Sequence, residues 1–189
     1  MLKTHRTVLE ILPVEDAALL LAYYIDNQAH LAPWEPVRND DYLTLANWQT
    51  QLAEAQSAFE AGEAYRFVAL NHARTEVIGV CNFTGVSRGA FQACFLGYSI
   101  ARKYQGQGLM QEILTAGIRY MFDVVGLNRV MANYMPGNTR SGYVLEKLGF
   151  EREGHAKRYL KIAGQWEDHI LTSKIREDLS GSPVGMNIV

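Results

Sequence analysis

The stretch Gln105-Gly106-Gln107-Gly108-Leu109-Met110 lies between a strand-like apolar segment that ends at Ile100 and the longest helical pattern in the chain. A helix N-terminus offers unpaired backbone N–H groups and the positive end of the helix dipole, which together bind phosphate oxygens. Glycines let the backbone approach such a ligand closely. The stretch therefore indicates either a phosphate-binding loop or a glycine-rich turn that only joins a strand to a helix.

Two common phosphate-binding motifs do not fit this stretch. A P-loop requires a Gly-Lys pair, and the chain contains none. A dinucleotide-binding fingerprint requires glycine or alanine three residues after Gly108, where Gln111 stands. Neither a P-loop NTPase nor a dinucleotide-binding enzyme is therefore predicted.

Outward from the loop, hydrophobic periodicity predicts a mixed order of strands and helices. Strands are expected at residues 4–12, 65–70, 76–84, 91–100, 128–134, 150–159 and 166–174, and helices at 15–30, 40–61, from after Gly106 to near Gly126, and at 138–148. Helices stand between only some of the strands, and several strands follow one another as hairpins. This order predicts a mixed α/β, mostly antiparallel twisted sheet of about seven strands, flanked by about four helices, and not a doubly wound parallel sheet.

The composition limits the domain count and the partners. The chain has 189 residues, 48% of them hydrophobic and 20% charged, which predicts a single globular domain at residues 1–178 with a flexible tail at 179–189. A formal net charge of −2 argues against a direct nucleic-acid site. No leader pattern and no apolar run of about 20 residues is present, so a cytoplasmic protein without a membrane segment is expected. The oligomeric state stays open.

The cysteines and histidines do not form a metal-binding pattern. Cys81 and Cys94 lie in apolar strand-like segments and are expected to be reduced core thiols. The five histidines (His5, His30, His72, His155 and His169) form no ligand cluster and are expected to be surface or partly buried side chains. No metal site is predicted.

The loop resembles the motif [QR]-x-x-G-x-[GA] of the GNAT acetyltransferases, which Gln105 and Gly108 match, while Met110 stands where a small residue is usual. The family also has an Asn-initiated helix that ends in Gly-Phe, and Asn138 to Gly149-Phe150 is similar to it. The resemblance covers about residues 5–175. It implies the GNAT fold, acetyl-CoA as the acetyl donor and a loop that binds its pyrophosphate.

Longer strings are similar to the GNAT subgroup that acetylates the N-terminal alanine of a ribosomal protein. They are residues 34–38 (WEPVR), 96–100 (LGYSI), 118–121 (IRYM), 131–136 (MANYMP) and 164–166 (GQW). This resemblance implies an acceptor α-amine on the N-terminus of a small-subunit ribosomal protein, the fifth one of that subunit. An α-amine has a pKa near 7.7–8.0, so a useful fraction is already neutral and a strong base is not obligatory.

The resemblance also implies a set of residues on the donor side. The implied acetyl-CoA contacts are Tyr98, Ser99, Ile100, Gln105, Gly106, Gln107, Gly108, Leu109, Met110, Asn138 and Ser141. A backbone N–H near Tyr98 to Ile100 would bind the carbonyl oxygen of the transferred acetyl group. Ser141 is the candidate catalytic proton donor to the leaving thiolate, because Leu145 stands where many relatives have a tyrosine. Ser141 as a local helix-start residue, and Asn138 as a helix cap, remain the alternatives.

On the acceptor side the candidates are Trp34 and Glu35. In the family fold, the segment between the first two helices borders the acceptor channel, so Glu35 could bind the ammonium group or relay its proton through water. Glu35 as a solvated loop carboxylate, and Trp34 as a plug between helix and sheet, are the alternatives. Two other functions also stay open: acetylation of a polyamine or aminoglycoside, and a catalytically silent domain that binds coenzyme A and assists ribosome assembly.

Overall fold

The structure is a computed structural model in which residues 1–177 are described, so the tail predicted at 179–189 lies outside the described residues. Eight strands form one sheet in the order β1-β2-β3-β4-β5-β6-β8-β7. The strands are β1 (Leu2–Lys3), β2 (Val8–Glu10), β3 (Tyr65–Leu70), β4 (Val77–Ser87), β5 (Ala93–Ile100), β6 (Arg129–Met131), β7 (Glu151–Ile162) and β8 (Gln165–Ile175). Among the strands of residues 1–177, only the β5–β6 pair is parallel. The predicted mixed, mostly antiparallel sheet is confirmed.

Four α-helices accompany the sheet: α1 (Ala17–Leu31), α2 (Leu45–Glu60), α3 (Leu109–Asp123) and α4 (Thr139–Lys147). Short 3-10 turns precede or follow them at η1 (Val14–Asp16), η2 (Ala32–Trp34), η3 (Asp40–Leu43) and η4 (Arg102–Tyr104). The four predicted helices are confirmed, with one shift at the second. It begins at Leu45 and not at residue 40, because the Thr44 side chain accepts a hydrogen bond from Asn47 N and caps the helix there.

The N-terminal strand predicted at residues 4–12 is wrong in extent. The chain turns between Thr4 and Thr7, where Thr4 N donates to Thr7 O at 2.9 Å, and the two short strands β1 and β2 pair across this turn. The extra strand raises the count from about seven to eight. Threonine-rich segments favour strands, but here the hydroxyls of Thr4 and Thr7 bond each other at 2.8 Å within the turn.

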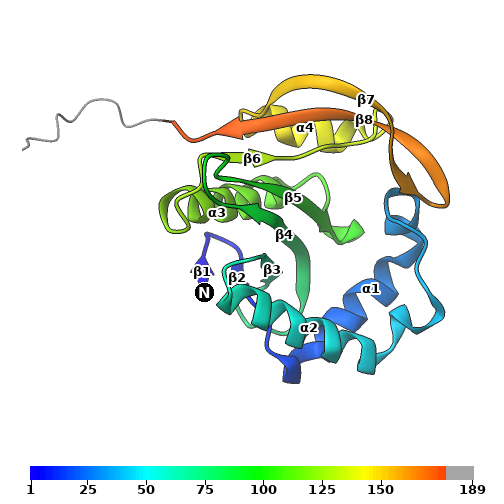
Figure 1. The fold of residues 1–189 in the computed structure, drawn as a ribbon. Helices are drawn as coiled ribbons and strands as arrows, with labels where there is room; N and C mark the ends of the chain where they lie inside the picture. Colours follow the sequence, from blue (N-terminus) through cyan, green and yellow to red (C-terminus); the bar gives the residue numbers. More distant parts are fainter. Residues whose placement is uncertain (178–189) are drawn as a thin grey trace, which may run out of the picture.

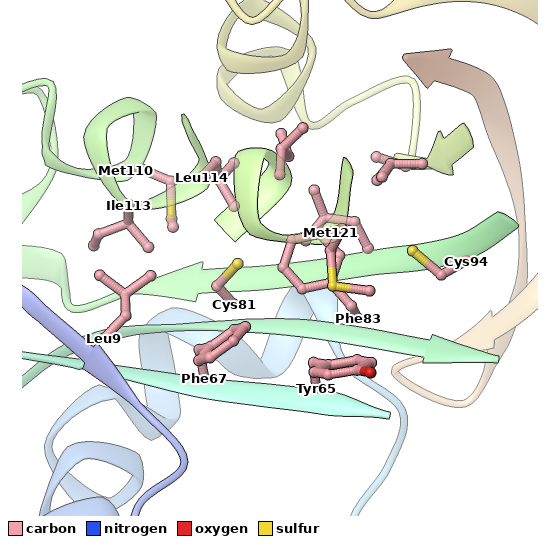
Figure 2. Packing of buried hydrophobic residues seen from close by; sticks show 14 of the residues in the cluster. Leu9, Tyr65, Phe67, Cys81, Phe83, Cys94, Met110, Ile113, Leu114 and Met121 are labelled. Atoms are coloured by element: carbon pink, nitrogen blue, oxygen red, sulfur yellow. The ribbon is translucent and has the colours of Figure 1, made fainter. Parts of the chain in front are cut away.

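The helices cover the two faces of the sheet in pairs, as Figure 1 shows. On one face α1 and α2 bury Leu20, Tyr24 and Trp48 against β3 and β4. On the other face α3 lays Met110, Ile113, Leu114 and Met121 over β4 and β5, where Cys81, Phe83 and Cys94 point up to meet them (Figure 2). Both cysteines are free and fully buried, as expected. The sheet is therefore a central layer with one helix pair on each side.

Helix α3 packs so closely on β4 that one of its positions has to be glycine. A Cβ added at Gly117 would lie 2.9 Å from the Phe83 ring and 3.0 Å from Cys81 Sγ. This close contact fixes the distance between α3 and the sheet, and with it the position of the loop that leads into α3. One histidine departs from its predicted place: His169 is buried, because it lies on the inward face of β8 beside Tyr159.

Candidate active site

The loop before α3 presents a run of unpaired backbone donors. Gly106 and Gly108 both have left-handed backbone angles, with φ of 73° and 72°. The first hydrogen bond of the helix runs from Glu112 N to Gly108 O at 3.2 Å. Among residues 1–177, no protein group accepts from the backbone N–H groups of residues 106–111. Six consecutive free donors at a helix N-terminus suit a group with several anionic oxygens, such as a pyrophosphate.

The N-terminal hairpin braces this loop from outside. Arg6 Nη1 donates to Gln107 O at 2.8 Å, and Arg6 Nε donates to Glu112 Oε2 at 2.7 Å. Thr4 Oγ1 donates to Glu112 Oε1 at 2.6 Å. Sequence reasoning missed Thr4 and Arg6, because their partners lie about a hundred residues further along the chain and no spacing rule connects them.

The end of β5 has one open edge. Strands β5 and β6 pair only from Ala93↔Arg129 to Phe95↔Met131. Beyond that point residues 132–134 separate from β5 and continue to bond β8 on their other edge. Within the described residues, no strand pairs with Leu96–Ile100 on that side. Ala101 N donates to Ile78 O of β4, and N–H groups alternate between the two edges of a strand. The N–H groups of Tyr98 and Ile100 therefore point into the opening between β5 and β6.

On one face of β5, Tyr98 meets the predicted proton donor. Tyr98 Oη lies 2.6 Å from Ser141 Oγ, and Asn138 Oδ1 accepts from Ser141 N at 3.2 Å, which confirms Asn138 as the cap of α4. Burial raises the pKa of Tyr98 to about 12, although the hydrogen bond with Ser141 acts in the opposite direction. Tyr98 therefore keeps its proton near neutral pH. The sequence indicated Tyr98 for its backbone N–H alone, and the role of its hydroxyl was missed.

On the opposite face of β5, Ser99 meets helix α1. Ser99 Oγ lies 2.8 Å from Tyr23 Oη. Burial raises the pKa of Tyr23 well above its ordinary value, and the negative charge of Glu35 contributes to the increase. Consecutive side chains of β5 thus reach α4 on one side of the sheet and α1 on the other, because side chains alternate along a strand.

Glu35 lies in a pocket beside α1. The pocket has a volume of about 510 Å³, and its walls come from α1, from residues 32–43 and from Ala163 in the β7–β8 turn. Its lining is Tyr24, Gln28, Leu31, Ala32, Glu35, Pro36, Val37, Arg38, Asn39, Asp40, Tyr42, Leu43 and Ala163. Ala163 N donates to Glu35 O at 2.9 Å, so this hydrogen bond joins the segment after α1 to the β7–β8 turn.

The charges in this pocket are mixed. Glu35 Oε2 lies 3.2 Å from Arg38 Nη2, and the Arg38 guanidinium stacks 4.5 Å from the centre of the Tyr42 ring. Burial raises the pKa of Tyr42 to about 12, and the charge of Glu35 adds to that increase. In the described part of the chain, no hydrogen bond or ion pair joins Glu35 to Ser141.

Trp34 and Tyr143 lie outside the groups just described. Trp34 ends the 3-10 turn η2 with 40% of its surface exposed and does not line the pocket that contains Glu35. Tyr143 is 62% exposed on the outer side of α4, with Lys147 Nζ 5.4 Å from its ring centre. Leu145 is buried in the core. The structure therefore brings Tyr98, Ser141 and Asn138 together, and it places Glu35 in a separate pocket that Trp34 does not line.

Two further observations concern metals and membranes. Among residues 1–177, no group of three or more His, Cys, Asp or Glu side chains is arranged to hold a metal ion. In the same range, no helix has the length and apolar character needed to cross a bilayer.

Hydrogen bonds of Tyr98 with Ser141 and of Gln105 with Arg140 join the end of β5 and the loop before α3 to the start of α4. Residues 6–151 match the family model described as "Acetyltransferase (GNAT) domain". The chain therefore belongs to the GNAT acetyltransferase family and is an acetyl-CoA-dependent N-acetyltransferase. The family and fold expected from the loop are confirmed.

Individual relatives are similar over nearly the whole chain. The [Ribosomal protein uS5]-alanine N-acetyltransferase of Escherichia coli (strain K12) is 48% identical over 177 residues, which are 94% of this chain and 91% of that protein. A crystal structure of ribosomal-protein-S5-alanine acetyltransferase from Vibrio fischeri has a TM-score of 0.89 and 38% identity, covering 93% of this chain and 96% of that one. Mycobacterium smegmatis RimJ in complex with CoA-disulfide has a TM-score of 0.85 and 29% identity, covering 95% and 90%.

Proposed function

We propose that this protein transfers the acetyl group of acetyl-CoA directly to the α-amine of an N-terminal alanine, that of the small-subunit ribosomal protein uS5. The observation that carries the acceptor is the 48% identity to the Escherichia coli enzyme of that name over 94% of the chain. The pocket beside α1 supports it, because it contains the carboxylate of Glu35, which can attract an ammonium group. The proposal implies a cytoplasmic enzyme with one catalytic domain at residues 1–178.

The donor side would bind and activate the thioester. The N–H groups of residues 106–111 would hold the pyrophosphate, and the side chain of Asn138 would cap α4 beside the pantetheine arm. The N–H groups of Tyr98 and Ile100 point into the β5–β6 opening, where they can donate to the thioester carbonyl oxygen as it becomes an oxyanion. One such donor contributes typically about 3–4 kcal/mol to the stability of a tetrahedral intermediate.

The proton transfers need one donor and one acceptor. The neutral α-amine attacks the carbonyl carbon, the C–S bond breaks, and the nitrogen loses one proton while the thiolate gains one. Ser141 would give the thiolate its proton and regain one from water, and the Tyr98 hydroxyl 2.6 Å away would donate a hydrogen bond to the serine oxygen meanwhile. Glu35 would attract the ammonium form of the acceptor and take up the released proton through water. Both Cys81 and Cys94 are buried, so neither is placed to form an acyl-enzyme.

The pocket does not favour a polycation as the acceptor. A polyamine or aminoglycoside carries several positive charges and requires a mostly acidic lining, whereas Arg38 occupies the same pocket as Glu35 and Asp40. The Ser141–Tyr98 pair and the free donors of the phosphate loop also support catalysis over a silent coenzyme A domain.

A panel of acceptors tests the proposal. Labelled acetyl-CoA is supplied with a peptide that carries the uS5 N-terminus beginning at alanine, the same peptide beginning at serine or methionine, the same peptide with a blocked α-amine, and spermidine. We expect the alanine peptide to have the highest kcat/KM, by about tenfold or more over spermidine, and the blocked peptide to receive no label. Transfer to spermidine with none to the alanine peptide would overturn the proposed acceptor.

A further inference from the structure

Three side chains link α1 to α4 beside the phosphate loop. Gln105 Nε2 lies 3.1 Å from His30 Nε2, and Arg140 Nη1 donates to Gln105 Oε1 at 3.0 Å. His30 is in the last turn of α1, and Arg140 is in the first turn of α4. Gln105 immediately precedes Gly106, so this His30–Gln105–Arg140 chain runs next to the six free N–H groups. It brings a positive charge to that anion site from another helix.

The donors and acceptors of this chain can be arranged in only one way. A guanidinium has donors and no acceptor, so Arg140 has to face the oxygen of the Gln105 amide. The amide nitrogen then faces His30 and donates to it. His30 Nε2 must therefore accept, which requires a neutral ring with its proton on Nδ1.

Protonation of His30 is incompatible with this arrangement. A protonated ring has an N–H at both nitrogens and can only donate. The Gln105 amide would have to turn over to meet it, and its NH₂ group would then face Arg140, which also only donates. Arg140 is exposed and makes no other hydrogen bond or ion pair within residues 1–177, so it would be released from the loop.

We propose that neutral His30 is a positioning residue, which holds Gln105 and through it Arg140 beside the phosphate loop, so that Arg140 binds the phosphate groups of acetyl-CoA. Acidification then weakens cofactor binding by releasing Arg140. The proposal depends on the acetyl-CoA site of the family and is independent of which amine is the acceptor.

The charged groups on the elements next to His30 make no hydrogen bond or ion pair with its ring within residues 1–177. Asp26 on α1 and Lys103 on η4 lie close enough to interact, and Lys103 also pairs with Glu76. Glu35, after η2, pairs with Arg38. Arg102 on η4 is exposed. In the described part of the chain, only Gln105 bonds the His30 ring. A change in the protonation of His30 therefore acts on the orientation of the Gln105 amide.

Two substitutions at position 30 imitate the two states. His30→Gln offers an acceptor oxygen at every pH, and His30→Lys is a permanent donor. Binding of coenzyme A, with no acceptor present, is measured by calorimetry from pH 5.5 to 8.0. We expect the Kd of the unaltered protein to rise about fivefold more than that of His30→Gln on acidification, and the Kd of His30→Lys to be about fivefold higher than that of His30→Gln already at pH 7.5. The 3′-phosphate of the ligand also titrates, but its effect is common to all three proteins.

A second pair of variants tests the route through Arg140. Arg140→Ala should raise the Kd for coenzyme A about fivefold. Adding His30→Gln to it should leave the pH dependence of that Kd unchanged, because without Arg140 the state of His30 no longer positions a positive charge. Equal pH dependence in the unaltered protein and His30→Gln, or a full His30 effect without Arg140, would overturn the proposal. Acetylation of the alanine peptide is assayed in parallel: if it fails while the His30 effect on binding persists, only the proposed acceptor is wrong.

Discussion

The proposed donor side and the proposed acceptor side of the active site are built from different kinds of groups. The proposed donor side consists mainly of the backbone N–H groups of Tyr98, Ile100 and residues 106–111, with Asn138 and Ser141 from the start of α4. The acceptor side consists of side chains from α1, the segment after it and the β7–β8 turn, which come from opposite ends of the chain. Backbone groups do not change when side chains mutate, so one donor can be kept while the acceptor pocket varies. This difference explains why the cofactor of a GNAT domain is easier to predict than its acceptor.

The largest expected effect is on the donor side, at Ser141. Ser141→Ala removes the proposed proton donor and should lower kcat about 100-fold while leaving the KM for acetyl-CoA nearly unchanged. Steady-state kinetics with both substrates varied measures this. If kcat stays within about twofold, Ser141 is a helix-start residue and not a proton donor.

A smaller effect is expected from the backbone of the loop. Gly108→Ala places a Cβ at φ of 72°, and the strain should turn at least one N–H away from the phosphates, raising the Kd for coenzyme A about tenfold. Gly89→Ala is the matched control, because Gly89 has φ of 67° and open space around its Cβ position but lies in the β4–β5 turn. Both variants should lose a similar free energy of unfolding, about 1–2 kcal/mol, and only Gly108→Ala should lose binding. Equal Kd values for the two variants would exclude the loop as the phosphate site.

Tyr98→Phe tests whether the buried hydroxyl acts through Ser141. It should lower kcat about fivefold, since one hydrogen bond to the serine oxygen is lost. The pH profile of kcat should keep its shape from pH 6 to 9, because the pKa of Tyr98 is raised to about 12 and the group does not ionise in that range. In a Ser141→Ala background the same change should have no further effect. An additive loss there would mean that Tyr98 acts independently of Ser141.

The smallest effect is expected on the acceptor side, at Glu35. Glu35→Gln removes a partly exposed charge and should raise the KM for the peptide about threefold without changing the Kd for coenzyme A. Glu15→Gln, an exposed carboxylate in η1, is the control and should change neither constant. If the peptide KM and kcat are unchanged in Glu35→Gln, Glu35 is a solvated loop carboxylate. If the affinity for coenzyme A changes instead, Glu35 contributes to cofactor binding and not to acceptor binding.

The local features of the sequence predicted most of the fold. Strand β3 has the predicted bounds, and Asn138 caps α4 as predicted. These succeed because each depends on neighbours within a few residues. The N-terminal hairpin was missed because strand β2 is held by its pairing with β3, far along the chain, and no local pattern shows that contact. Only its turn is closed locally, by hydrogen bonds between Thr4 and Thr7.

The sequence by itself indicated the family and the acetyl donor through its resemblance to the GNAT motifs, and it predicted the helix cap at Asn138, because such short motifs depend on neighbours in the chain. Only the tertiary structure decided which side chains meet. Tyr98 finds Ser141 across 43 residues, Tyr23 finds Ser99 across 76, and Arg6 braces Glu112 across 106. His30 reaches Gln105 in the same way. Such partners have no fixed spacing, since they are brought together only when the helices pack on the two faces of the sheet.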